Sequence, residues 1–272
     1  MKSFPLLLAL ALFPLLSGWT LGGDPEEEDA AVKAEVTTLI SSALAEEKDQ
    51  TPGARLKKLQ QAADAVQAKF PRNVLVAEPL QAADSADALE KALRQAQKTL
   101  TFQIKHEADL PAGFPQPTPV GEIGLKQYPA YRLAKTGSRN DSGFFKLFTH
   151  ITLNRIEMTA PVEMTYDSGQ DQSPQQTAMA FLYGDPTIGQ VGDKLGGVNV
   201  ADVPAITTVS MGLAGDVNPK RLAETERRLE TWLSQHAPEY ERTGKLRVLG
   251  YNSPRIADER RYFEVELPVG KK

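Results

Sequence analysis

The sequence of 272 residues predicts an α+β protein in which a helical N-terminal region precedes a mostly antiparallel sheet that carries two helices. Three observations predict this class. Residues 24–110 are rich in Ala, Gln, Glu and Lys and poor in β-branched residues, which favours helices. Prolines then gather in residues 111–119 and predict an extended linker. Beyond them, short alternating segments predict strands, and an amphipathic helix interrupts them once in each of two successive halves.

The first residues have the pattern of an export signal. Lys2 supplies a positive charge, and residues 4–16 form an apolar run that is too short to span a bilayer as a helix. Small residues between Ser17 and Gly23 offer cleavage sites, although the exact bond stays open. We therefore expect residues 1–23 to be a signal peptide and the mature protein, without a transmembrane span, to be periplasmic or secreted. An uncleaved anchor or a buried N-terminal helix is the alternative.

Amphipathic patterns predict three helices in the N-terminal region. Apolar residues recur at three- and four-residue spacings, and the second helix begins with Thr51 as N-cap and Pro52 in the first turn. The region can be a docked subdomain or an extended stalk, and the sequence does not identify its protein partner. The apolar stripes are Val32, Val36, Leu39, Ile40 and Leu44; Leu56, Leu59, Ala63, Val66 and Phe70; and Ala88, Leu89, Ala92, Leu93 and Ala96.

The C-terminal part alternates between strands and two helices. The clearer helix begins at Asn218 and Pro219, and the other, at 143–151, carries most of the phenylalanines of this part. Each half of this part thus holds one helix among its strands. Strands are expected at 120–128, 131–136, 158–166, 177–183, 205–211, 245–251 and 261–268.

Composition argues against several classes of function. The formal net charge is −4, so the chain has no basic surplus for phosphates, and we expect no nucleic-acid partner. The absence of cysteine excludes disulfides, thiol catalysis and thiolate metal sites. No Walker loop, GxSxG or HExxH motif occurs. Glu157 and Glu163 lie six residues apart on one strand, too far apart for a catalytic pair, and we interpret them as outward polar positions.

Three stretches resemble one known family in order and spacing. They are GEIGLKQYPAYRLA at 121–134, FFKLFTHITLNRIEMTAPVEM at 144–164, and LGYNSP at 249–254 followed by RRYFEVELP at 260–268. The chain from 120 to 269 resembles the SOUL haem-binding protein family, whose signature is a short helix followed by a Met-Thr-Ala-Pro-Val strand. The helical region lies outside the resemblance, and residues 120–272 form the expected SOUL-like domain.

The resemblance implies a distorted antiparallel β-barrel of two pseudo-repeated halves with two flanking helices. It also implies that haem or another tetrapyrrole binds in an apolar groove beside the first helix. Here that helix carries Phe144, Leu147, Phe148 and Ile151, which we take as candidate ligand-binding residues. We expect the protein to bind a small apolar ligand of this kind, with no other cofactor.

Two further residues near this helix have the chemistry of haem ligands. A neutral imidazole is a good ligand of haem iron, so His150 is the candidate metal ligand. The alternative is a hydrogen-bonded core or rim histidine. Met158, in the Met-Thr-Ala-Pro-Val strand, can contact haem through its thioether, and ordinary core packing is its alternative.

The sequence is also compatible with two other functions. One is an enzyme that modifies tetrapyrroles, or a hydrolase-like enzyme, on the same barrel; it would need a buried carboxylate or tyrosine with a free path to the groove. The other is a non-catalytic interaction module of the cell envelope. In that case the groove would be filled by the protein's own side chains.

Overall fold

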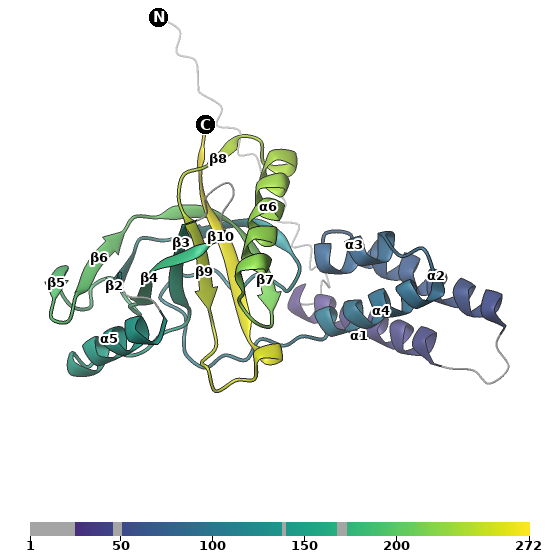
Figure 1. The fold of residues 1–272 in the computed structure, drawn as a ribbon, viewed down its shortest axis with the longest axis horizontal. Helices are drawn as coiled ribbons and strands as arrows, with labels where there is room; N and C mark the ends of the chain where they lie inside the picture. Colours follow the sequence, from purple (N-terminus) through teal and green to yellow (C-terminus); the bar gives the residue numbers. More distant parts are fainter. Residues whose placement is uncertain (1–24, 46–50, 138–139, 168–172) are drawn as a thin grey trace, which may run out of the picture.

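The computed structural model describes residues 25–45, 51–137, 140–167 and 173–272 (Figure 1). The predicted signal peptide, at residues 1–23, lies outside the described residues. Within these ranges no helix is both long and apolar enough to cross a membrane. The fold is α+β: helices come first, and a large antiparallel sheet with two further long helices follows.

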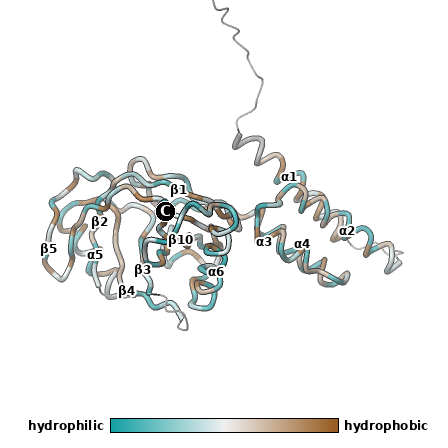
Figure 2. Tube along the Cα trace, turned by 90° about the horizontal axis from the view of Figure 1, so that it is seen from above, coloured by the Kyte–Doolittle hydropathy of each residue, from teal (hydrophilic) through white to brown (hydrophobic). Residues whose placement is uncertain are grey.

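Four helices of the described chain form the N-terminal region, to one side of the sheet (Figure 2). Local sequence sets two of their starts, because the side chains of Thr51 and Ser85 accept hydrogen bonds from the first turns of α2 and α4. Most residues of the predicted stripes form one apolar core that includes Ile40, Leu59 and Leu93, whereas Leu39 and Leu56 are exposed. The helix that the sequence did not predict is α3, whose eight residues show no clear polar face. The helices are α1 (Pro25–Leu44), α2 (Pro52–Lys69), α3 (Val74–Gln81) and α4 (Ala86–Leu100).

This bundle is docked on the sheet domain and is not an extended stalk. The Val74 amide donates to Gly121 O at 2.8 Å, and Asn73 Nδ2 donates to Val120 O at 2.7 Å. An ion pair of 2.6 Å also joins Glu78 of α3 to Arg228 of the helix Pro219–His236. The start of α3 is therefore tied to the start of the first strand.

A ten-stranded sheet follows, in the order β1-β7-β10-β9-β3-β4-β2-β6-β5, with β8 paired to β10. Every named pair of strands is antiparallel. The path ends at β1 and β5, and no pairing between these two occurs in the described residues, so closure into a barrel stays a prediction. The strands are β1 (Ile123–Tyr128), β2 (Tyr131–Thr136), β3 (Val162–Asp167), β4 (Gln175–Leu182), β5 (Gly192–Lys194), β6 (Val198–Val203), β7 (Ile206–Ala214), β8 (Tyr240–Arg242), β9 (Leu246–Gly250) and β10 (Tyr262–Lys271).

Two long helices, α5 (Asn140–Leu153) and α6 (Pro219–His236), cover separate parts of the sheet (Figure 1). Helix α5 packs on β2, β4 and β6, and α6 packs on β7 and β10. Asn218 caps α6 by accepting a hydrogen bond from the Arg221 amide at 3.0 Å, as the Asn-Pro pair predicts. Each half of the domain thus carries one helix. A short 3₁₀ turn, Asp258–Arg260, precedes β10.

Residues 102–119 cover another surface of the sheet; we call this segment the strap. Alternation along β10 separates the two faces, because Phe263 and Val265 pack in the core beneath α6 while Glu264 contacts the strap. The predicted Pro-rich linker, 111–119, is the second half of the strap. It is free of regular helix and strand, as its prolines predict, but it is also packed: Phe114 and Thr118 are buried.

Candidate functional site

The centre of α5 belongs to the core of the domain. Leu147 is 0% exposed and Ile151 is nearly as buried, and both pack in one cluster with Phe181 and Val200 of the sheet. The sequence interpretation placed these two side chains in an open groove. The structure instead uses them to attach the helix to β4 and β6, so the space directly beneath α5 is filled.

One flank of α5 is aromatic and exposed. The side chains of Phe145 and Phe148 are 65% and 47% exposed, and Phe144 is half-buried. The rings of Phe144 and Phe148 are nearly parallel, with centroids 6.0 Å apart. Phe144 also meets Phe181 of the sheet edge-on at 5.1 Å, which anchors the group to the core. We call Phe144, Phe145 and Phe148 the aromatic edge; it presents flat apolar surface to solvent.

His150 lies on the opposite flank of α5. It is two residues from Phe148, which corresponds to a separation of about 160° around a helix. Its Nε2 is 2.9 Å from the hydroxyl of Tyr183, and Asn154 Nδ2 is 3.4 Å from its Nδ1. Burial, with a smaller effect of Lys194, lowers the pKa of His150 and keeps the ring neutral.

This geometry does not fit haem iron ligated by His150. The side chain is buried, and iron at Nε2 would have to replace the bond to Tyr183. A ligand that stacks on Phe148 would also lie on the flank of α5 opposite His150, away from the imidazole. The described residues contain no cluster of three or more metal-binding side chains of the His, Asp or Glu type.

Met158 lies apart from both the aromatic edge and His150. It lines a cavity of about 500 Å³ just beyond the end of α5, together with Arg155, Ile156 and Leu110. Arg155 has a positive φ of 53°, which is uncommon for a residue other than glycine. None of the three phenylalanines lines this cavity. The six predicted site residues are therefore divided among the core, the aromatic edge, the histidine flank and the Met158 cavity.

A cluster of buried charges, which the sequence pattern did not predict, lies beneath the strap. Arg247 Nη2 is 2.8 Å from Glu163, and Lys126 Nζ is 2.7 Å from Glu264. Glu264 and Glu266 are 0% exposed. Glu163 is buried as well, so its predicted outward position was wrong. We call Lys126, Glu163, Arg247, Glu264 and Glu266 the charge cluster.

Tyrosine hydroxyls satisfy much of this cluster. Tyr128 donates to Glu266 at 2.5 Å, Tyr131 donates to Glu163 at 3.2 Å, and Tyr251 donates to Glu264. Burial, and next the negative charge of Glu266, raises the pKa of Tyr128 above its ordinary value. These tyrosines therefore stay protonated and act as donors.

Glu266 is the least satisfied carboxylate of the cluster. Its Oε2 has no hydrogen-bond donor among the described residues, although Arg247 Nη1 lies 3.5 Å away. Burial, opposed by Arg247 and assisted by Glu264, raises the pKa of Glu266 to about 7. Because Glu264 and Glu266 alternate with apolar residues along β10, a sequence pattern would normally place them in solvent. The sequence signal that could have indicated their burial is the presence of tyrosines in several other strand segments, such as Tyr128 on β1, Tyr131 on β2 and Tyr251 just after β9.

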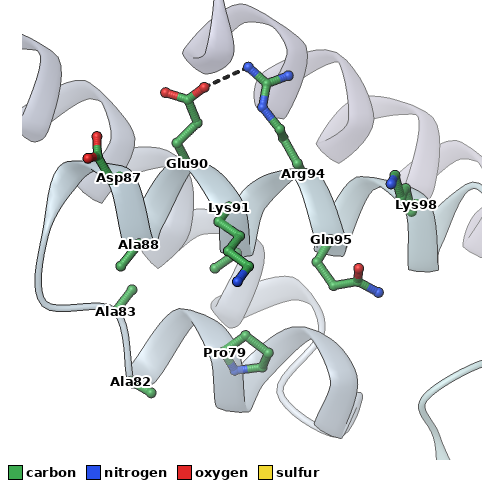
Figure 3. A pocket seen from close by; sticks show the side chains of 11 residues that line it. Pro79, Ala82, Ala83, Asp87, Ala88, Glu90, Lys91, Arg94, Gln95 and Lys98 are labelled. Carbon is green, nitrogen blue, oxygen red and sulfur yellow. Dashed lines mark hydrogen bonds and ion pairs between the residues drawn. The ribbon is translucent and has the colours of Figure 1, made fainter.

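A further cavity, of about 780 Å³, lies between α3 and α4 (Figure 3). Its floor is made of small residues such as Pro79, Ala83 and Ala88, and an ion pair of Glu90 with Arg94 at 2.6 Å lies along α4. It offers neither a buried polar group nor a catalytic arrangement of side chains, and it lies outside the sheet domain.

Comparisons with known proteins concern mainly the sheet domain. A family model described as "SOUL heme-binding protein" matches residues 120–268, which is more than half of the 272 residues. The search of curated proteins gives no match.

Several solved structures align with the chain at low identity. The EcmrR C-terminal domain is 18% identical over 56% of this chain and 98% of that chain, with a TM-score of 0.42. A hydrolase from Listeria innocua is 13% identical over 56% and 94%, with a TM-score of 0.42. SAV2435 bound to tetraphenylphosphonium is 13% identical over 55% and 94%, with a TM-score of 0.33. These TM-scores are too low to support any inference about this chain.

Proposed function

Because this chain belongs to the SOUL haem-binding protein family through residues 120–268, we propose that it binds haem or a related tetrapyrrole on the aromatic edge of α5. The observation that carries the proposal is the exposure of Phe145 and Phe148, at 65% and 47%, on a helix that is otherwise anchored in the core. Exposed aromatic groups held rigidly at one place on a surface are typical of ligand and partner sites.

The contribution of one ring follows from its exposed area. A phenylalanine side chain can bury about 200 Å², so covering the exposed half of Phe148 removes roughly 90 Å² from water. At about 25 cal/mol per Å² this contributes roughly 2 kcal/mol, or about thirtyfold in affinity. Phe144 lies parallel to Phe148 and extends the flat surface. Apolar contact with the macrocycle therefore supplies most of the binding free energy, and His150 does not ligate the iron.

Titration of the purified protein with haemin and with metal-free protoporphyrin tests this proposal. Both ligands are expected to bind at micromolar concentration, since the contact is with the ring and not with the metal. Phe148→Ala is expected to weaken both about thirtyfold. Leu153→Ala is the matched control, because Leu153 is also exposed on α5 but lies about 140° away around the helix.

Two outcomes contradict the proposal. The first is that neither porphyrin binds at micromolar concentration. The second is that Phe148→Ala and Leu153→Ala both bind porphyrin as tightly as the natural protein does. Met158→Ala provides a separate arm: a loss of binding there, with Phe148→Ala unchanged, would move the ligand to the cavity beside Arg155.

Export and barrel closure are part of the same proposal. The apolar run at residues 4–16 supports a cleaved signal, so that the ligand would be bound in the periplasm or outside the cell. Sequencing the N-terminus of the protein from its native host tests this, and an intact Met1 would contradict it. The family resemblance supports closure of the sheet into a distorted barrel of two pseudo-repeated halves.

A second candidate is a non-catalytic interaction module. It is supported by the packing of α5, because Leu147 and Ile151 fill the space between this helix and the sheet, as the side chains of a closed groove in such a module would. The enzyme alternative receives no comparable support. It would use the buried carboxylates Glu163, Glu264 and Glu266. Each of them accepts a hydrogen bond from a tyrosine, and Glu264 and Glu266 have no exposed surface. We propose no reaction.

A further inference from the structure

The strap covers a surface that the family domain itself does not cover. The family match begins at residue 120, whereas the strap ends at Pro119. Beneath the strap lie buried tyrosines and apolar residues of the sheet, which pack against Phe114, Phe102 and Leu110 of the strap. The strap is therefore a segment outside the family domain that is bound to the surface of that domain.

The middle of the strap inserts an aromatic side chain between two tyrosines. The ring of Phe114 meets Tyr128 edge-on at 5.0 Å and Tyr131 edge-on at 5.2 Å. Such edge-to-face pairs are favourable arrangements of aromatic rings. Phe114 is buried, although no regular element holds it. It occupies an aromatic slot in the sheet.

Thr118 meets the sheet through its backbone. Its N–H donates to Glu264 at 2.8 Å, and its carbonyl accepts a hydrogen bond from the hydroxyl of Tyr262. Its side chain donates to Ser210 at 3.2 Å. Two of these three bonds use groups that every residue other than proline carries, so they recognise an extended peptide more than a particular side chain.

Prolines make the strap suited to this position. Pro111, Pro115, Pro117 and Pro119 have no N–H to satisfy. Residues 111–114 form a turn, in which the Phe114 amide donates to Pro111 O at 3.1 Å, and the three prolines that follow favour an extended conformation. One of the remaining donors, the Ala112 amide, bonds to Gly184 O at 2.9 Å. Docking of preformed extended proline-rich segments onto aromatic grooves is a recurring mode of peptide recognition.

The charge cluster places a fixed hydrogen-bond acceptor beneath the strap. Buried ion pairs contribute little net stability, and an apolar replacement is often as stable. Here Glu264 is fully buried, and it accepts hydrogen bonds both from Lys126 and from a residue of the strap. A carboxylate held in place beneath a bound peptide is a specific acceptor for a backbone N–H.

We propose that this face of the sheet domain is a peptide-binding groove, that residues 102–119 occupy it within the same chain, and that its external partner is an extended proline-rich segment of another protein. The segment presents an aromatic side chain to the slot between Tyr128 and Tyr131. A backbone N–H four residues later reaches Glu264, as in Phe114 and Thr118. The groove is independent of porphyrin binding on α5.

A peptide-binding experiment on the full chain tests the groove. The probe is a fluorescent peptide with the sequence of residues 109–120, DLPAGFPQPTPV, and the protein is the Phe114→Ala variant, whose strap no longer fills the slot. We expect this variant to bind the probe at least tenfold more tightly than the natural protein does. A probe with Ala in place of Phe is expected to bind at least tenfold more weakly. Gln116→Ala, at an exposed position of the strap, is the control and should behave like the natural protein.

The proposal fails if folded Phe114→Ala does not bind the probe, or if it binds both probes equally. It also fails if that variant binds free indole but not the peptide, because the slot would then be a packing cavity. Hydrogen exchange on the natural protein gives a second test that needs no substitution. The amides of Ala112 and Thr118 should exchange at least 100-fold faster than that of Val265 in β10; equal protection would show that the strap opens only when the domain unfolds.

Discussion

Glu266→Gln is expected to remove a pH dependence of stability that the natural protein shows between pH 5 and pH 8. Glu266 is fully buried next to Tyr128, and burial raises its pKa from 4.5 to about 7. The folded state therefore holds this proton more tightly than the unfolded chain does. The resulting stabilisation is complete below pH 4.5 and is lost as the pH rises through 7.

The size of the effect follows from the shift in pKa. The pKa of Glu266 rises by roughly 2.5, and at about 1.4 kcal/mol for each unit of pKa this gives about 3–4 kcal/mol as an upper figure for the complete titration. Glutamine imitates the protonated acid, and its carbonyl oxygen can accept the bond that Tyr128 now donates. The variant should keep most of the stability that the natural protein has at pH 5 and should not lose it at pH 8.

Urea unfolding at pH 5 and pH 8 measures this. Between the two pH values the free energy of unfolding of the natural protein should fall by roughly 2–3 kcal/mol more than that of Glu266→Gln, because pH 5 already lies slightly above the unfolded pKa. The lowered pKa of His150 acts in the opposite direction, but it is common to both proteins and cancels in the comparison. Glu157→Gln, at an exposed position, is the control. Parallel pH profiles of the natural protein and Glu266→Gln would refute the reasoning.

Three further predictions concern other parts of the molecule. His150→Ala should leave the absorbance spectrum of bound haemin unchanged and should lower stability by about 1 kcal/mol through the lost bond to Tyr183; a shifted Soret band would show iron ligation. Gly121→Ala should destabilise the docked bundle by more than about 1 kcal/mol, since a Cβ there would overlap Asn73 Oδ1 and φ is +84°; an unchanged melting temperature would contradict this. Leu59→Ala should cost about 2–5 kcal/mol within the bundle core and leave porphyrin binding intact, which calorimetry and titration together can check.

Much of the fold is encoded locally and was accessible from the sequence. The caps at Thr51 and Asn218 act within one turn of their helices, so the pattern alone locates the starts of α2 and α6. Strands β5, β6 and β8 were not predicted. The three-residue β8 depends on pairing with β10, which lies far along the chain, whereas β5 and β6 form a local hairpin around Gly196 and Gly197 that has no clear alternating pattern. Helix α3 was missed because its apolar residues face both the bundle and the sheet.

Only part of the candidate site could be predicted from the sequence, because the burial of its side chains depends on contacts between separate elements. The phenylalanines of α5 were evident, but their division into core and solvent depends on how the helix sits on β2, β4 and β6. The burial of Glu264 depends on Thr118, which is 146 positions away in the sequence. No periodicity along β10 can reveal a cover that comes from so distant a part of the chain.

The hydrogen bonds between Asn73, Val74 and the start of β1 give the strap an unusual topology. They close the chain from residue 73 to residue 121 into a ring, and the strap is one arm of that ring. If the strap is lifted, both of its ends stay fixed, so that it returns at an effective concentration in the millimolar range or higher. A competitor from another protein must exceed that value, which would make the groove respond only to strong or locally abundant ligands.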